Sequence, residues 1–243
     1  MRTDDERGFI LHRYPYGETS VLLEAFTYDF GRVGLVGRGV RRGGRAFAGA
    51  QLRPFQPLLL SWSGRGGDLS TLVRAEAPEA AISLGGNAVW CGFYVNELLL
   101  RLLHRHDPHA DLYVAYDEVL RSLAVSGCQE SALRIFEKRL LAALGYGLTL
   151  AREAHTGEPV RADLTYRYVR DEGVVRAGPD TPGRTVGGAT LMALAREDFR
   201  DATALREAKG LLGDALAPLL GDRPLYTRGL FRTMQAARKP PRE

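Results

Sequence analysis

Hydrophobic and polar positions alternate with a period of about two through most of residues 7–77, which predicts β-strands. Turns that contain Gly, Pro or Asp separate the apolar segments. The expected strands cover residues 8–14, 19–28, 32–36, 56–62 and 69–75. Short strands at this spacing, with a long second strand and a large loop after the third, indicate a small closed barrel. We expect an OB-fold, with an SH3-like barrel as the alternative.

After Pro78 the apolar period lengthens to that of an amphipathic helix. Asp107 is interpreted as the N-cap of the second helix, with Pro108 at its first position. The expected helices cover residues 87–104, 108–123, 131–144, 190–196, 201–219 and 227–237.

Residues 150–186 are polar, contain Gly and Pro, and are weakly patterned, although 165–170 and 174–177 could pair as a hairpin. The fold class expected is therefore α+β, a five-stranded OB-fold barrel followed by an α-helical bundle with an irregular insert. The expected domains are residues 1–80 for the barrel, 81–150 and 187–237 for the bundle, and 151–186 for the insert.

Composition excludes several classes of protein. The chain has 243 residues, of which 45% are hydrophobic and 26% charged, as in ordinary globular proteins. No apolar run approaches the ~20 residues that cross a bilayer, and the polar, acidic N-terminus is no secretory signal. Cys91 and Cys128 are far apart in sequence and imply no disulfide framework, so we expect a cytoplasmic protein.

The stretch from Phe30 to Gly67 contains seven arginines, ten glycines and no Asp or Glu. Arginine keeps its charge and presents a planar fork to phosphate oxygens. We therefore interpret this stretch as a nucleic-acid contact loop between strands, with a solvated loop that binds nothing as the alternative.

The chain offers two weak candidates for other chemistry. His104, His106, Asp107 and His109 have a spacing that metal ligands can have, but a polar loop between helices explains them better. Gly37-Arg38-Gly39 resembles the start of a dinucleotide fingerprint, but Arg42 occupies the third glycine position. We expect no catalytic residues, no metal and no other cofactor.

Short motifs follow one another in a specific order through nearly the whole chain. In the barrel region they are Phe9-Ile10-Leu11-His12, Glu18-Thr19-Ser20, Gly31-Arg32-Val33, Gly39-Val40-Arg41-Arg42 and Gln56-Pro57-Leu58-Leu59-Leu60. Farther on they are Tyr94-Val95-Asn96-Glu97-Leu98-Leu99, Ala132-Leu133-Arg134-Ile135-Phe136-Glu137, Leu144-Gly145-Tyr146-Gly147, Gly157-Glu158-Pro159-Val160, Thr165-Tyr166-Arg167-Tyr168 and Arg228-Gly229-Leu230-Phe231-Arg232. In this ordered set the chain resembles the RecO family of bacterial recombination mediators.

The resemblance implies an OB-fold followed by a helical bundle, and no enzyme activity. RecO-like proteins bind single- and double-stranded DNA and anneal complementary strands. They act on strands coated by single-stranded-DNA-binding protein (SSB), and with RecR they help RecA replace SSB. The resemblance thus implies a cytoplasmic, nucleoid-associated bacterial protein and leaves open whether RecF takes part.

One departure from the family concerns zinc. Many relatives carry Cys-x-x-Cys pairs in the region that corresponds to residues 150–186, whereas this chain has no cysteine there. His155 alone cannot hold a structural zinc, which needs about four ligands. We expect an insert without metal.

The resemblance turns the Arg-rich stretch into a candidate DNA site. The candidate DNA-binding residues are Arg13, Arg32, Arg38, Arg41, Arg42 and Arg45. The candidate stacking residues, with barrel core as the alternative for each, are Tyr14, Tyr16, Tyr28, Phe30 and Phe47.

A second candidate site concerns SSB, whose acidic tail ends in an apolar residue and a carboxylate. A receptor for this tail needs an apolar pocket with Arg or Lys at its rim. Arg134 is the candidate, because it matches a family arginine; the alternative is a helix charge paired with Glu130 or Glu137. Two other functions stay open: a general OB-fold RNA-binding protein, and a metal-dependent nuclease that uses residues 104–111.

Overall fold

The computed structural model describes residues 2–39, 52–64, 67–125, 127, 129–178 and 182–230. It divides into two compact units. The barrel unit contains the described residues up to Ala124 and those from Pro224 on, and the helical unit contains Val125–Arg223. The division into functional domains expected from the sequence stays a prediction.

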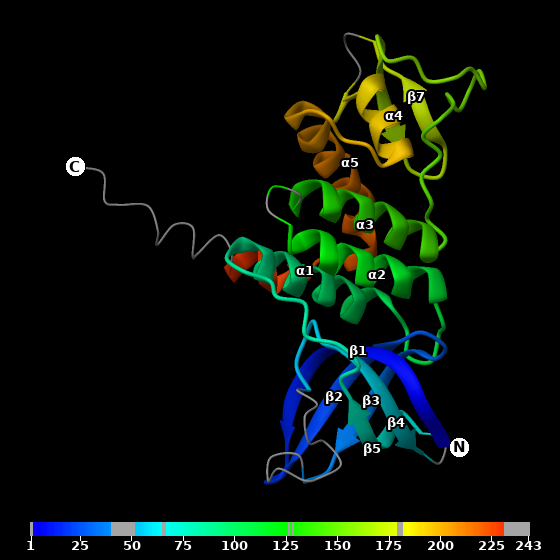
Figure 1. The fold of residues 1–243 in the computed structure, drawn as a ribbon. Helices are drawn as coiled ribbons and strands as arrows, with labels where there is room; N and C mark the ends of the chain where they lie inside the picture. Colours follow the sequence, from blue (N-terminus) through cyan, green and yellow to red (C-terminus); the bar gives the residue numbers. More distant parts are fainter. Residues whose placement is uncertain are drawn as a thin grey trace. The chain divides into compact units, whose positions relative to one another are not determined.

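Five strands form the closed barrel in the order β1-β2-β3-β5-β4 (Figure 1). They are β1 (Arg2–Tyr16), β2 (Ser20–Thr27), β3 (Gly31–Gly37), β4 (Pro57–Ser63) and β5 (Leu69–Glu76). β1 is antiparallel to both β2 and β4, and a parallel pairing of β3 with β5 closes the barrel. The predicted five-stranded OB-fold is confirmed.

The first strand is longer than its apolar pattern predicts. It begins at Arg2, and its polar first half pairs with β4 from Arg2 opposite Ser63 to Phe9 opposite Pro57. The register shifts between Thr3 and Glu6, which breaks the simple alternation of buried and exposed positions. An interrupted alternation of polar residues gives little strand signal in the sequence.

The barrel is filled by aliphatic side chains, with Ile10, Leu23 and Leu35 fully buried. Outside the barrel, the ring of Phe9 packs against that of Tyr116, with centroids 5.1 Å apart. Tyr116 belongs to α2 (Ala110–Leu123), which lies beside α1 (Asn87–Leu102) in the barrel unit (Figure 1). These two helices therefore cover one part of the outer face of the barrel.

The expected N-cap of α2 is wrong. The helix begins at Ala110, its N-cap residue is His109, and no side chain caps it. The preceding residues are held by the barrel instead, because the His106 amide donates to the Arg32 carbonyl over 2.9 Å. The Asp107 carboxylate contacts the His109 ring at 3.2 Å and is not available as a cap.

The helical unit combines three helices with a small sheet (Figure 1). The helices are α3 (Gln129–Ala143), α4 (Gly188–Arg196) and α5 (Ala202–Leu220), and the strands are β6 (Thr165–Val169), β7 (Gly173–Arg176) and β8 (Val186–Gly187). The predicted hairpin is confirmed as β6 and β7, which pair antiparallel with Tyr168 opposite Val174. Asp201 caps α5 by accepting from the Ala204 amide at 2.8 Å.

Two further findings concern the helices of the described residues. None of them is long and apolar enough to span a membrane. The predicted last helix is present over residues 226–230, and the remainder of its expected range lies outside the described residues.

Candidate nucleic-acid interface

Two of the six candidate arginines, Arg13 and Arg38, are exposed at one end of the barrel. Arg38 follows Gly37, which pairs with Val21, and Val21 in turn pairs with Pro15. Neighbouring strands lie ~4.8 Å apart, so the end of β3 is ~10 Å from the exposed part of β1. The register therefore brings these two charges to the same end of the barrel.

Arg32 lies in a different environment, although it belongs to the same Arg-rich stretch. Its guanidinium Nη1 donates to the Leu100 carbonyl over 2.6 Å, at the end of α1. Burial of this half-buried side chain lowers the pKa of Arg32. Arg32 thus links the end of α1 to the barrel through a hydrogen bond. It is not exposed as Arg13 and Arg38 are.

The other three candidate arginines, Arg41, Arg42 and Arg45, lie outside the described residues, as does Phe47. Their assignment to the DNA site stays a prediction. They follow directly in sequence after Arg38 and Gly39, the last described residues beyond β3.

The candidate stacking residues separate into two groups. Tyr28 packs edge-on against Tyr113, with Arg7 above its ring at 3.9 Å, and Phe30 packs against Trp62 beside the barrel core. Both have structural partners, as the alternative interpretation expects. Tyr14 and Tyr16 are instead 45% and 50% exposed on β1.

Arg134 lies on α3 and is only 3% exposed. Its Nη2 donates to the Glu137 carboxylate over 2.8 Å, and Nη1 lies 3.8 Å from Glu130. Nε and Nη1 have no hydrogen-bond partner among the described residues. Arg134 is thus paired with Glu137, as the alternative interpretation expects, but it is buried, and its assignment to the SSB tail stays a prediction.

The helical unit contains a cavity of about 520 Å³ that sequence reasoning missed. Leu141, Leu148 and Leu211 contribute apolar surface to this cavity, which we call the helical-unit pocket. Its basic lining residues are Arg167, Arg170 and Arg184, and its acidic ones are Asp171, Glu172 and Asp214. A volume in this range is typical of sites for small ligands.

The arginines of the helical-unit pocket differ in how firmly they are held. Arg184 donates to Asp214 over 2.7 Å at the surface, and Arg170 lies 5.9 Å from the ring centre of Tyr146. Among the described residues, Arg167 Nη1 donates to the Pro182 carbonyl over a long 3.4 Å, and its buried Nε has no hydrogen-bond partner. Arg167 therefore retains donor capacity for an anion.

Sequence reasoning missed this pocket because its lining comes from distant segments. Leu141 lies in the last turn of α3, Arg167 lies on β6, and Leu211 belongs to α5. Two of the family motifs contribute residues to its lining, namely Leu144-Gly145-Tyr146-Gly147 and Thr165-Tyr166-Arg167-Tyr168. These motifs were the signal in the sequence from which the pocket could have been found. Nothing in the sequence showed that these motifs meet.

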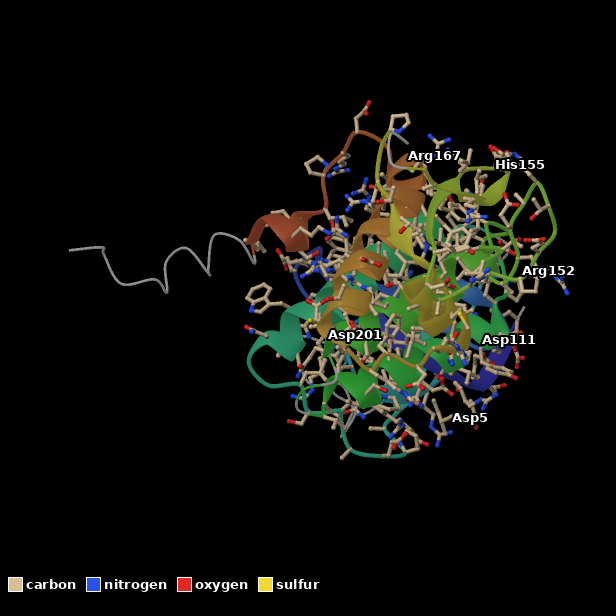
Figure 2. The ribbon with its side chains drawn as sticks, turned by 90° about the horizontal axis from the view of Figure 1, so that it is seen from above. Asp5, Asp111, Arg152, His155, Arg167 and Asp201 are labelled. Atoms are coloured by element: carbon tan, nitrogen blue, oxygen red, sulfur yellow. The ribbon has the colours of Figure 1, made fainter. Side chains whose placement is uncertain are left out.

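The insert places its one histidine against carboxylates. His155 Nε2 contacts Glu172, and Nδ1 lies 3.8 Å from Glu153, whose carboxylate also accepts from the Thr156 amide over 2.8 Å. Figure 2 shows His155 and Arg152 pointing outward from the insert. Within the described ranges no group of three or more His, Cys, Asp or Glu residues is arranged to hold a metal ion.

Comparison with known proteins shows which family this chain is similar to. The family model described as "Recombination protein O N terminal" matches residues 1–80, and "Recombination protein O C terminal" matches residues 85–228. The DNA repair protein RecO of Nitrosococcus oceani is 48% identical over 236 residues, which are 97% of this chain and 95% of the relative. That of Methylococcus capsulatus is 46% identical over 228 residues, which are 94% and 93% of the two chains. That of Azoarcus sp. is 41% identical over 240 residues, which are 96% and 97%.

Proposed function

Because the chain belongs to the recombination protein O (RecO) family, we propose that it is a DNA-binding mediator of recombinational repair. In this proposal it binds single- and double-stranded DNA and anneals complementary strands. Together with RecR, it helps RecA load onto SSB-coated strands in the bacterial cytoplasm. The observation that carries the DNA-binding part is the exposed end of the OB-fold barrel, where Arg13 and Arg38 lie.

The proposed contact is electrostatic and independent of sequence. Arginines bind phosphate oxygens, which carry no sequence information, so any strand is accepted. Two complementary strands repel each other through their phosphates, and a basic surface that neutralises part of this charge allows them to approach. This mechanism requires no bond to be made or broken by the protein, and we propose that it is not an enzyme.

The proposed selectivity for SSB-coated DNA lies in the helical unit. An acidic tail that ends in an apolar side chain needs apolar surface for its end and cations for its carboxylates. The helical-unit pocket offers Leu141 and Leu211 for the former, and Arg167, Arg170 and Arg184 for the latter. Arg134 was the candidate from sequence, but its burial against Glu137 favours the pocket as the docking site.

Joint binding of strand and tail explains why the protein would act at coated DNA. Each contact alone can be weak, because two contacts on one SSB–DNA complex raise the effective concentration of the second after the first has formed. Loose contacts also release the annealed product easily.

The DNA site is tested by reversing the charges at and after the end of β3. The variant Arg38→Glu/Arg41→Glu/Arg42→Glu should bind a labelled single strand more weakly than the parent. The logarithmic salt dependence of its affinity should fall by about 2, because ~0.7 counterions are released per phosphate contact in single strands. Binding is measured by fluorescence anisotropy across a salt series, with RNA of the same length as a competitor.

The matched control is Arg200→Glu, which reverses an 86% exposed arginine in the helical unit. It should leave both the affinity and its salt dependence as in the parent. If the triple variant behaves like this control, the basic stretch is not the DNA site. Stronger competition by RNA than by DNA would support a general RNA-binding protein instead.

A further inference from the structure

The second half of β1 extends beyond the part of the strand that pairs with β4. The described pairing with β4 ends at Phe9, whereas pairing with β2 continues to Tyr16 opposite Ser20. Side chains two residues apart in a strand point to the same face. His12, Tyr14 and Tyr16 therefore form a row along this face of β1, which we call the aromatic ladder.

The aromatic ladder is exposed, whereas the tyrosines of α2 in the same unit are packed. Tyr14 and Tyr16 are 45% and 50% exposed, while Tyr113 and Tyr116 are 8% and 0% exposed. His12 and Tyr14 are in contact, with ring centroids 4.2 Å apart and planes at 50°. The ladder thus presents aromatic surface to solvent that the barrel core does not use.

The surroundings of the aromatic ladder identify the kind of ligand. Partial burial lowers the pKa of His12 in spite of the nearby Glu24 carboxylate, which favours the neutral ring. Neutral π-surface is suited to stacking against a nucleobase. Arg13 alternates with the ladder residues and so points to the other face of β1. Arg38 is the nearby cation, because it directly follows Gly37, the partner of Val21, and Val21 is next to Ser20, the partner of Tyr16. A row of rings with an arginine at its end matches the bases and phosphates of an unpaired strand.

We propose that His12, Tyr14 and Tyr16 form a stacking ladder for the unpaired bases of single-stranded DNA. This inference rests on the proposed DNA-binding function and adds a basis for telling single strands from duplexes. In a duplex both faces of each base are covered by its neighbours, so the ladder can act on unpaired bases alone. The arginines bind the phosphates of either form.

The experiment compares three ligands of equal length: an oligo(dT) strand, an abasic strand with the same phosphates, and a DNA duplex. The parent should bind oligo(dT) more tightly than the abasic strand. The variant Tyr14→Ala/Tyr16→Ala should bind oligo(dT) at least roughly tenfold more weakly, since stacking is worth about 1–3 kcal/mol per base. Its affinities for the abasic strand and for the duplex should equal those of the parent.

Three control variants separate stacking from other effects. Tyr14→Phe/Tyr16→Phe keeps the rings and should retain the affinity for oligo(dT). Tyr226→Ala removes a tyrosine that is 72% exposed in the same unit and should have no effect on any ligand. Tyr16→Trp supplies a fluorescent ring, whose emission should be quenched by oligo(dT) but not by the abasic strand; this reading does not depend on the stability of the alanine variant.

The outcomes distinguish the ladder from the function on which it rests. The proposed stacking is wrong if the alanine variant binds oligo(dT) as tightly as the parent does. It is also wrong if the variant's affinity for the abasic strand falls by as much as its affinity for oligo(dT). Unquenched emission from Tyr16→Trp bound to oligo(dT) also overturns it. A parent protein that binds none of the three ligands would overturn the proposed function itself.

Discussion

Asn96 links the two helices of the barrel unit to β1. Its side-chain amide donates to the Leu11 carbonyl over 2.9 Å, and its carbonyl oxygen accepts from the Tyr116 hydroxyl at 2.7 Å. One buried side chain thereby joins β1, α1 and α2. Leu11 lies beyond the last pairing with β4 and at the register shift between β1 and β2, so Asn96 supplies a donor where regular strand pairing is interrupted.

Asn96→Ala should lower the free energy of unfolding by about 2–3 kcal/mol, because it leaves two buried polar groups without their partner. Urea denaturation monitored by circular dichroism measures the loss. Val114→Ala, at a 45% exposed position on α2, is the control and should change stability by less than about 0.5 kcal/mol. Equal stabilities of the two variants would show that the buried amide has no special role.

For Arg134 we expect that removing one charge destabilises the protein more than removing both charges of its ion pair. Its partner Glu137 is 1% exposed, so Arg134→Ala removes the cation that faces a buried carboxylate and should cost roughly 3 kcal/mol of stability. The double variant Arg134→Met/Glu137→Leu removes both charges and should recover most of this loss. If the double variant loses binding to an acidic tail peptide at full stability, Arg134 contacts the tail after all.

Which arginines face solvent could not be predicted from the sequence. Arg32 and Arg38 are in the same stretch and have the same residue type, but Arg32 lies where the end of α1 docks and Arg38 lies beyond the last paired residue of β3. The difference depends on a helix that follows almost 70 residues later, at Leu100. Local pattern carries no information on such a contact.

At the scale of elements, Glu197 connects the end of α4 to α3. It ends α4 in the left-handed conformation with φ of 58° and accepts from Arg139 Nη2 at 2.6 Å and Lys138 Nζ at 3.1 Å. Lys138 also donates to the Ala195 carbonyl in the last turn of α4, over 2.9 Å. Burial opposes ionisation of Glu197, but hydrogen bonds from both cations outweigh it and lower the pKa of this carboxyl.

The lowered pKa of Glu197 predicts a dependence of stability on pH. A carboxyl whose pKa is lower in the folded state contributes fully above its ordinary pKa of 4.5, and this contribution is lost as the pH falls through the lowered value. Glu197→Gln should therefore be less stable than the parent by about 1–2 kcal/mol at pH 7. The difference should shrink as the pH falls below the ordinary value.

Thermal unfolding of the parent and the variant at several pH values tests this expectation. Asp198→Asn, next to Glu197 but exposed, is the control and should follow the parent. A deficit for Glu197→Gln that is the same at every pH would show that ionisation of this carboxyl is not the source of the stabilisation.

The sequence predicted elements well where the apolar period was uninterrupted and less well elsewhere. Strands β2 to β5 and helices α3 to α5 were located within a few residues of their observed bounds. The start of β1 was missed because polar residues pair there across a register shift, and the N-cap of α2 was assigned wrongly because the barrel holds His106. The helical-unit pocket was missed because packing, not pattern, brings its walls together.

For the whole molecule, we propose separate tasks for the two compact units. In this proposal the barrel unit binds strands through arginines and, by the further inference, through its aromatic ladder, and the helical unit binds the acidic tail of SSB in its pocket. Substitutions in one unit should therefore leave the task of the other unchanged.

Annealing of complementary strands coated with SSB tests this central claim most directly. The measurement is the rate of duplex formation from dye-labelled strands, with full-length SSB, with SSB that lacks its tail, and without SSB. The parent should anneal bare strands and strands coated with full-length SSB, and should be slow on strands coated with tail-less SSB. The pocket variant Arg167→Ala/Arg170→Ala should anneal bare strands normally and be slow with either form of SSB. A pocket variant that anneals strands coated with full-length SSB as fast as the parent does would contradict the account.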